Sequence, residues 1–134
     1  DDLYAMDIDS LNRYVREKGL LADVYFDFDR SELRADAAER LSKNAAFLAE
    51  HPSFVVLVEG HADERGTNEY NLALGQDRAS STRRYLGSLG VSGQRLDVVS
   101  YGEERPECTD PVEDCWWKNR RAHFRITGRS SDAG

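Results

Sequence analysis

The sequence predicts a single domain in which two long helices cover the same side of a mixed β-sheet. Strand-like and helix-like segments alternate along the chain, in the order strand, helix, strand, helix, strand, turn, strand. Crossover connections between parallel strands share one hand, so we expect both helices on one side of the sheet. A length of 134 residues suits one hydrophobic core.

The N-terminal segment predicts a short helix packed on the outside of the domain. Asp9 and Ser10 are typical of a helix cap, and apolar residues at helical spacing continue until Gly19. Residues 24–29 then alternate between two faces, which predicts a half-buried strand with Phe28 on its apolar face.

A long helix is predicted over residues 36–50. It begins with a capping-box pattern at residues 36–39, keeps apolar residues at helical spacing and ends before Pro52. The following run, residues 54–58, is apolar without interruption and rich in β-branched residues. Such a run is typical of a strand that is central in its sheet and covered on both faces.

A second long helix is predicted to begin at Thr67 or Asn68 and to reach Leu89 before Gly90. Helical spacing assigns four of its residues to a core stripe, namely Ala79, Thr82, Leu86 and Leu89. Two further strands are predicted over residues 96–102 and 121–127, with a helical turn between them near residues 113–118. The chain thus divides into an extension with a short helix at 1–22, a domain at 23–128 and a disordered tail at 129–134.

The composition argues against several kinds of partner. A net charge of −7, from 25 acidic and 18 basic residues, disfavours a partner bound mainly through phosphates, so we expect no nucleic acid. No apolar run approaches the roughly 18 to 20 residues of a membrane span. The N-terminus lacks the pattern of a signal peptide, which leaves the compartment open.

Cys108 and Cys115 are predicted to form a disulfide. Two cysteines are too few for a zinc site, and their spacing is not the C-x-x-C of a redox enzyme, whereas two free thiols stay an alternative. Closing so short a loop is expected to stabilise the fold by about 2 to 3 kcal/mol. A disulfide would also imply an oxidising compartment such as the periplasm.

The charged loop between the central strand and the second long helix is the candidate binding site. Asp63 follows the strand directly, and Arg78 lies fifteen residues later on the helix. Opposite charges on one rim suit a ligand that carries an ammonium and a carboxylate close together, as an amino-acid zwitterion does. Backbone N–H groups at the helix start, residues 66–68, would add donors, and Phe28 and Asp29 could form a wall.

Spacing alone leaves other interpretations open. Asp63 and Arg78 could instead pair with each other, or with Arg65 and Glu69, at the surface. Paired carboxylates could indicate a glycosidase, and the acidic residues near this loop are Glu59, Asp63, Glu64 and Glu69. We expect neither catalysis nor a metal site, because no nucleophile motif occurs and His61 lies far in sequence from the other histidines.

Several motifs occur in order and at matching intervals. They are Gly60-His61-Ala62-Asp63-Glu64-Arg65-Gly66-Thr67, Glu69-Tyr70-Asn71, Leu74-Gly75-Gln76, Arg78-Ala79, Ser100-Tyr101-Gly102-Glu103-Glu104-Arg105-Pro106 and Asn119-Arg120-Arg121-Ala122. Together they resemble the OmpA-like peptidoglycan-binding family, most closely its members in the Tol-Pal system, over residues 24–126. The resemblance implies a non-catalytic α/β (α+β) sandwich of order βαβαββ, with a mixed four-stranded sheet, two long helices on one face and the short N-terminal helix.

The resemblance also gives the site a ligand, the peptide stem of peptidoglycan with its meso-diaminopimelate. It implies that Asp63 takes the ammonium and Arg78 the carboxylate at the free end of that residue. The remaining expected ligand-binding residues are Phe28, Asp29, Asn71, Leu74 and Thr67. Gly66, Asn119 and Arg120 are expected to support the site. No cofactor and no metal are implied.

The resemblance further implies a periplasmic monomer of a Gram-negative bacterium that ties the outer membrane to the cell wall. Members of the Tol-Pal system carry a lipid on an N-terminal cysteine, and this chain has no cysteine near Asp1. The periplasmic propeller protein of the Tol system is an expected partner, for which Trp116, Trp117 or Tyr101 could form an interface. The alternative is a wall anchor outside the Tol-Pal system that acts chiefly as a protein-interaction module.

Overall fold

The computed structural model describes residues 2–129 of the chain, and within these residues four strands form one mixed sheet. The strands lie in the order β1-β4-β2-β3. Their bounds are Val24–Tyr25 for β1, Phe54–His61 for β2, Leu96–Gly102 for β3 and Arg121–Arg129 for β4. β2 and β3 run parallel, whereas β4 is antiparallel to β1 and β2. The predicted mixed sheet is confirmed, and β2 lies inside it.

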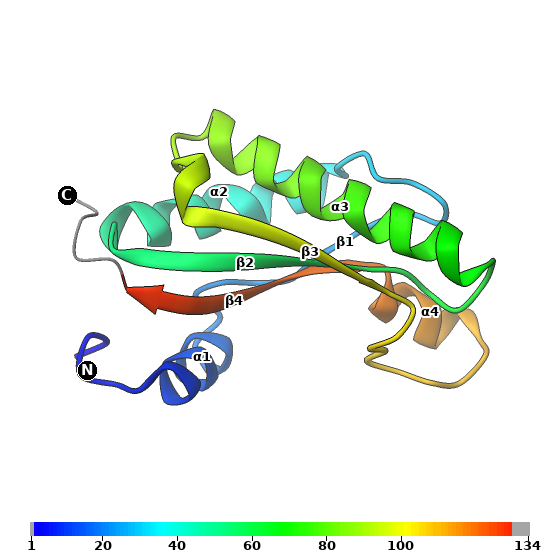
Figure 1. The fold of residues 1–134 in the computed structure, drawn as a ribbon, viewed down its shortest axis with the longest axis horizontal. Coiled ribbons are helices and arrows are strands. Elements are labelled where there is room, and N and C mark those ends of the chain that lie inside the picture. Colours follow the sequence, from blue (N-terminus) through cyan, green and yellow to red (C-terminus); the bar gives the residue numbers. More distant parts are fainter. Residues whose placement is uncertain (1, 130–134) are drawn as a thin grey trace.

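In the described chain, two long helices cover one face of the sheet. They are α2 at Ala35–Glu50 and α3 at Asn68–Ser88, and Figure 1 shows both on the same side of the strands. The shorter elements are α1 at Ile8–Glu17, the 3-10 helix η1 at Gly93–Arg95 and α4 at Glu113–Asn119. Figure 1 also shows α1 on the opposite side of the sheet. The predicted sandwich is confirmed.

The core lies between β2 and the two long helices. Val56 and Val58 of β2 are fully buried and belong to one cluster with Leu48 of α2 and Leu86 of α3. Burying one such side chain contributes about 1.5 to 3 kcal/mol. On the other face of β2, Leu57 is only half-buried. β2 was predicted to be covered on both faces, but only the face towards the two long helices is fully covered.

Two helix starts differ from the sequence prediction. Asp7, rather than Asp9 or Ser10, caps α1, since its carboxylate accepts a hydrogen bond from the Ser10 N–H at 2.8 Å. The predicted capping box of α2 does not form. Asp36 lies in the first turn of that helix and pairs with Arg34 at 3.0 Å, and the helix begins one residue earlier than predicted.

The predicted strand over residues 24–29 ends at Tyr25. β4 pairs with two residues of β1, and the chain then turns through Asp29, which has a positive φ of 57°. Phe28 therefore leaves the sheet and is 54% exposed instead of facing inward. Alternation along a short segment cannot reveal where its partner strand stops.

The N-terminal helix lies on the face of the sheet opposite the two long helices and adds buried residues to the core cluster there. Leu11 and Val15 are buried in the same cluster as the sheet. The Asn12 amide donates to the Ile126 carbonyl and accepts from the Ile126 N–H, both at 2.8 Å, which fixes α1 against β4. This pair explains why so short a helix docks firmly on the open face of the sheet.

The end of α3 differs from the prediction at one core position. Leu89 lies just past the helix and is 40% exposed, whereas Val91 is buried in the cluster. The prediction that residues 129–134 form a disordered tail is wrong for Arg129, which is the last residue of β4 and pairs with Phe54. Residues 130–134 lie outside the described residues. Across residues 2–129, none of the helices is both long and apolar enough to cross a membrane.

Candidate functional site

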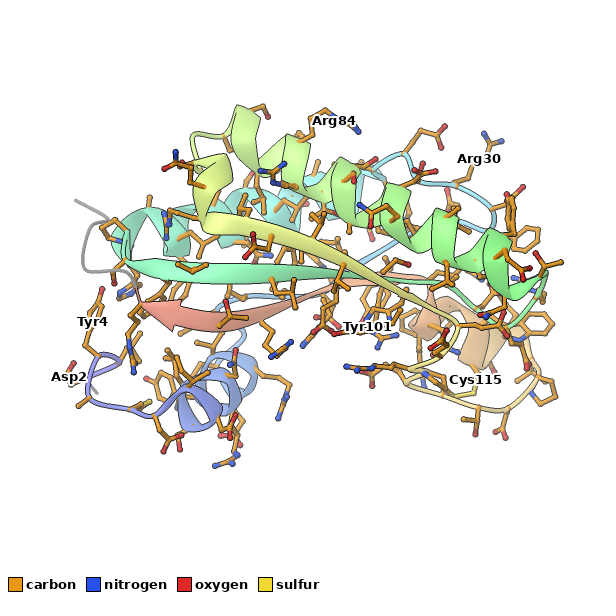
Figure 2. All side chains as sticks on the ribbon, viewed as in Figure 1. Asp2, Tyr4, Arg30, Arg84, Tyr101 and Cys115 are labelled. Atoms are coloured by element: carbon orange, nitrogen blue, oxygen red, sulfur yellow. A yellow bond between two sulfur atoms is a disulfide. The ribbon has the colours of Figure 1, made fainter. Side chains whose placement is uncertain are left out.

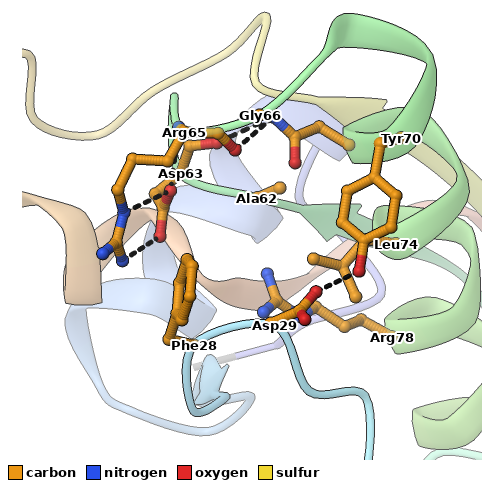
Figure 3. Close-up of a pocket in the computed structure, with 10 residues that line it drawn as sticks. Phe28, Asp29, Ala62, Asp63, Arg65, Gly66, Tyr70, Leu74 and Arg78 are labelled. Carbon is orange, nitrogen blue, oxygen red and sulfur yellow. Dashed lines mark hydrogen bonds and ion pairs between the residues drawn. The ribbon is translucent and has the colours of Figure 1, made fainter.

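A pocket of about 220 Å³ opens where β2 ends and α3 begins, opposite the loop between β1 and α2. Figure 3 shows its lining side chains pointing into one cavity. The lining residues are Phe28, Asp29, Ala62, Asp63, Arg65, Gly66, Tyr70, Asn71, Leu74 and Arg78. The structure therefore brings together six of the seven residues expected to contact a ligand.

Two glycines allow α3 to lie directly on β2. A Cβ atom added to Gly60 would stand 1.7 Å from the carbonyl oxygen of Gly75. The backbones of strand and helix thus touch, which brings the first turns of α3 to the end of β2. This approach places a side chain three residues further along α3, that of Arg78, at the base of the pocket.

Arg78 is fully buried and anchored by three backbone carbonyls. Its Nε donates to Arg30 at 2.9 Å, Nη1 to His61 at 2.9 Å and Nη2 to Asp27 at 3.1 Å. A guanidinium has five N–H groups, so two of them have no partner in the described chain. Burial lowers the pKa of Arg78 to about 10, against the opposing charge of Asp63, and the side chain stays charged at neutral pH.

Asp63 is 4% exposed and bound by Arg65. Its Oδ1 accepts from the Arg65 backbone N at 3.0 Å and Nε at 3.1 Å, and its Oδ2 accepts from Nη2 at 2.8 Å. Arg120 Nη1 lies 3.5 Å from the same Oδ2. Burial acts to raise the pKa of the Asp63 carboxyl, but these hydrogen bonds and charges hold the pKa below its usual value. The carboxylate is therefore ionised.

The sequence left open that Asp63 and Arg78 only form surface ion pairs, and that alternative is correct in part. Asp63 does pair with Arg65, but in the pocket rather than at the surface, and the two described side chains of Asp63 and Arg78 form no ion pair with each other. The pocket thus presents a negative and a positive group that do not neutralise each other by direct contact.

Asn71 fixes the loop that carries Asp63. Its Nδ2 donates to the carbonyls of Asp63 at 3.2 Å and Arg65 at 3.1 Å, and to Glu103 at 2.8 Å. Gly66 has a positive φ of 101° at the turn into α3. Thr67 caps that helix by accepting from the Tyr70 N–H at 3.1 Å, and it does not line the pocket. These residues shape the loop.

The opposite wall comes from the turn after β1. Phe28 stacks its ring on the Arg65 guanidinium, with 3.9 Å between Cζ and the ring centroid. Asp29 accepts a hydrogen bond from the Tyr70 hydroxyl. Figure 3 shows Leu74 between Tyr70 and Arg78, where it gives the pocket an apolar side.

Asn119 and Arg120 support the site from behind. Arg120 donates from Nε to the Phe26 carbonyl at 2.8 Å and from Nη1 and Nη2 to Glu113 at 3.0 and 3.1 Å. The Asn119 side chain forms hydrogen bonds with the backbone at the start of the cysteine loop, the segment that Cys108 and Cys115 close. It accepts from the Glu107 N–H at 2.7 Å and donates to the Cys108 carbonyl at 2.8 Å. Neither residue lines the pocket.

The predicted disulfide between Cys108 and Cys115 is present. Figure 2 shows Cys115 at the end of the molecule where α3 begins, so the bridged loop borders the site. Of the aromatic residues considered for an interface, Trp117 is 40% exposed, Tyr101 stacks with Arg105, and Trp116 packs on the guanidinium of Arg65.

Sequence reasoning missed three lining residues, Ala62, Arg65 and Tyr70. Helical spacing offered a signal for one of them. Tyr70 precedes Leu74 by four residues, and Leu74 precedes Arg78 by four, so all three lie on one face of α3. Arg65 offered no such signal, because its role depends on contacts with distant aromatic residues.

Of the acidic residues considered for catalysis, Asp63 alone lines the pocket. Glu59 lies on the other face of the sheet, where it pairs with Arg125 at 3.0 Å, and Glu64 accepts a hydrogen bond from Trp116 at 3.1 Å. Throughout residues 2–129, no three histidine, cysteine, aspartate or glutamate side chains gather as metal ligands.

Comparisons with known proteins point in one direction. Residues 25–120 match the OmpA family. The chain is 52% identical over 105 residues to the peptidoglycan-associated lipoprotein of Brucella melitensis, covering 78% of this chain and 62% of that protein. It is 48% identical over 108 residues to the protein of the same name from Rhizobium meliloti, covering 81% and 61%. The chain thus spans about three-fifths of these relatives' length.

Solved structures share the fold. The crystal structure of the peptidoglycan-associated lipoprotein from Burkholderia pseudomallei is 43% identical, with a TM-score of 0.75 over 78% of this chain and 89% of that one. The cell wall anchor of the T6SS from Pseudomonas aeruginosa is 20% identical, with a TM-score of 0.69 over 92% and 98%. The second likeness concerns the fold alone.

Proposed function

The chain belongs to the OmpA family, and from that premise we propose that it is a non-catalytic cell-wall anchor. Its pocket binds the stem peptide of peptidoglycan by the zwitterionic end of meso-diaminopimelate. The names of its relatives, peptidoglycan-associated lipoproteins, support attachment at the outer membrane through a lipid on the protein. The disulfide is consistent with the oxidising periplasm.

The observation that carries the proposal is the pair of separate opposite charges in one small cavity. The ammonium of the ligand binds the ionised Asp63 carboxylate. The carboxylate of the ligand accepts hydrogen bonds from the two N–H groups of Arg78 that have no partner in the described chain. Leu74 contacts the methylene chain between the two ends of diaminopimelate.

The state of Asp63 favours binding over proton transfer. A general acid at neutral pH needs a raised pKa, whereas the pKa of Asp63 is lowered. A fixed negative charge instead suits a permanent partner for an ammonium. This electrostatic setting supports the non-catalytic part of the proposal.

The expected affinity is modest. Three or four charge-assisted hydrogen bonds, each about 1.5 to 3 kcal/mol, give roughly micromolar binding after the costs of association. Many copies at one membrane facing many stems on one wall would raise the effective concentration. The tether therefore does not require a tight single site.

Calorimetric titration tests the pocket with two ligands and two variants. The ligands are a stem tripeptide ending in meso-diaminopimelate and the same peptide ending in lysine, which lacks the terminal carboxylate. We expect the lysine peptide to bind at least about tenfold more weakly, because it leaves Arg78 without its partner. Asp63→Asn keeps the shape of the side chain but loses its charge, and is expected to abolish measurable binding. Asp97→Asn, at an exposed position of β3, is the matched control.

Equal affinity for both peptides, or unchanged binding by Asp63→Asn, would remove the basis of the proposal. Association with the propeller protein of the Tol system and a monomeric state belong to the same proposal. Co-purification of that protein with this chain, with and without stem peptide, and sedimentation equilibrium of the chain test these two points.

A further inference from the structure

Arg65 lies between two aromatic rings and two carboxylates at the mouth of the pocket. Its guanidinium carbon stands 3.9 Å from the ring centroid of Phe28 and 4.0 Å from that of Trp116. Its Nη2 is 2.8 Å from Asp63 and 4.0 Å from Glu113. Figure 3 shows the Arg65 side chain lying along Asp63, with Phe28 beside it. A long flexible side chain is thus held in one position.

The consequence falls on Asp63. Arg65 occupies Oδ1 with two N–H groups and Oδ2 with one short hydrogen bond. Each carboxylate oxygen has two lone pairs, so Oδ2 keeps capacity for a ligand ammonium, with Arg120 Nη1 only at 3.5 Å. The contact with Arg65 therefore orients the carboxylate and does not saturate it. A lysine could neither form this fork nor stack between two rings.

The second ring comes from the disulfide-linked segment. Trp116 lies on α4 immediately after Cys115, which is buried and bridged to Cys108. Its indole N–H donates to Glu64 at 3.1 Å, in the same loop as Asp63. The neighbouring Trp117 faces elsewhere, since its ring packs edge-on against Tyr25 at 5.2 Å. Two adjacent tryptophans thus differ in whether they reach the site.

We propose that Trp116 is a positioning residue of the ammonium-binding site, which clamps Arg65 against Phe28 so that Arg65 presents the Asp63 carboxylate to the ligand. The disulfide and α4 hold Trp116 in place for this purpose. The proposal rests on the proposed function, because it concerns the same pocket and the same ammonium. The proposal gives the cysteine loop a role in ligand binding. Neither the sequence of that loop nor its position at the rim of the pocket indicates such a role.

Affinity for the meso-diaminopimelate tripeptide provides the first test. With Trp116→Leu, binding is expected to weaken about tenfold, as for the loss of a desolvated cation–π contact. Trp116→Phe retains a ring and is expected to stay within about threefold of the wild-type protein. Trp117→Leu removes the same size of side chain from the same helix and is expected to bind as the wild type does. Circular dichroism of each variant verifies the fold.

The pH dependence of binding provides a readout that a purely structural role would not change. The charged groups around Asp63 are Arg65, Arg120, Arg78 and Glu113. Removing the Arg65 contact leaves burial to raise the pKa of Asp63, so the acid midpoint of binding is expected to rise. For Arg65→Met we expect a rise of about one pH unit or more, and for Trp116→Leu a smaller rise in the same direction.

The outcomes separate the two proposals. If the wild-type protein does not bind the tripeptide, the proposed function fails. If it binds, but Trp116→Leu and Arg65→Met keep its affinity and its acid midpoint, Trp116 is not a positioning residue. Tighter binding by Arg65→Met would also overturn the inference, because Arg65 would then compete with the ligand for Asp63. An equal loss in Trp117→Leu would reduce the effect to the stability of α4.

Discussion

The substitution Gly60→Ala tests whether the close contact between β2 and α3 sets the geometry of the site. The added Cβ would stand 1.7 Å from the Gly75 carbonyl oxygen, whereas ordinary contacts begin at 3.4 Å. Strand and helix must therefore separate by up to about 1.7 Å, the difference between these distances. A carbonyl of the helix backbone cannot rotate away as a side chain could.

The shift reaches the ligand site because Arg78 lies on the same helix. Its hydrogen bonds to the strand end and to the loop after β1 are 2.9 to 3.1 Å long and cannot survive a displacement above 1 Å. Overpacking of this kind costs about 3 kcal/mol or more, which lowers the melting temperature by roughly 10 °C in a domain of this size. We also expect binding of the stem tripeptide to fall at least tenfold.

Differential scanning calorimetry and peptide titration measure the two effects. Gly87→Ala is the control on α3, because nothing lies within 4 Å of its added Cβ. Since alanine is favoured over glycine inside a helix, this variant is expected to be more stable by about 0.5 to 1 kcal/mol. Melting and binding of Gly60→Ala at wild-type values would refute the view that this backbone contact sets the position of Arg78.

Three further predictions concern stability. Arg78→Met leaves three backbone carbonyls without their donor, so it is expected to lower the free energy of unfolding by about 3 kcal/mol or more. Urea denaturation measures this loss, and an unchanged free energy of unfolding would show that those hydrogen bonds are unimportant. Reduction of the disulfide is expected to cost about 2.5 kcal/mol on the chain-entropy model and to weaken peptide binding through Trp116; equal unfolding midpoints with and without reductant would contradict this. Burial acts to raise the pKa of Glu59, but the His61 ring at 3.5 Å and the hydrogen bond from Arg125 at 3.0 Å outweigh it and lower the pKa to about 2. The contribution of Glu59, up to about 3 kcal/mol, is present above pH 4.5 and is lost as the pH falls towards 2, so Glu59→Gln is expected to flatten the acid limb of stability measured by thermal melting.

Local sequence patterns determined the main elements of the fold. The period of apolar residues located both long helices, and the β-branched run after Pro52 located β2, because side chains at fixed spacing share one face. Asp63 and Arg78 became candidates for one rim because one follows the strand and the other lies on the next helix, but spacing alone left a surface pairing open, and the family resemblance was needed to favour a ligand site. These features depend on neighbours close in the chain.

Contacts between distant segments decided the rest. β1 ends at Tyr25, whose partner Arg121 is the first residue of β4, and Phe28 in the following turn stacks on Arg65. The three carbonyls that hold Arg78 come from residues 17 to 51 positions earlier in the chain. The clamp on Arg65 needs Trp116, 51 residues further on. The sequence by itself therefore indicated Asp63 and Arg78 as charged groups of the site, but not Arg65. Only the tertiary structure decided how each is held, because the groups that hold them are neighbours in space and not in the chain.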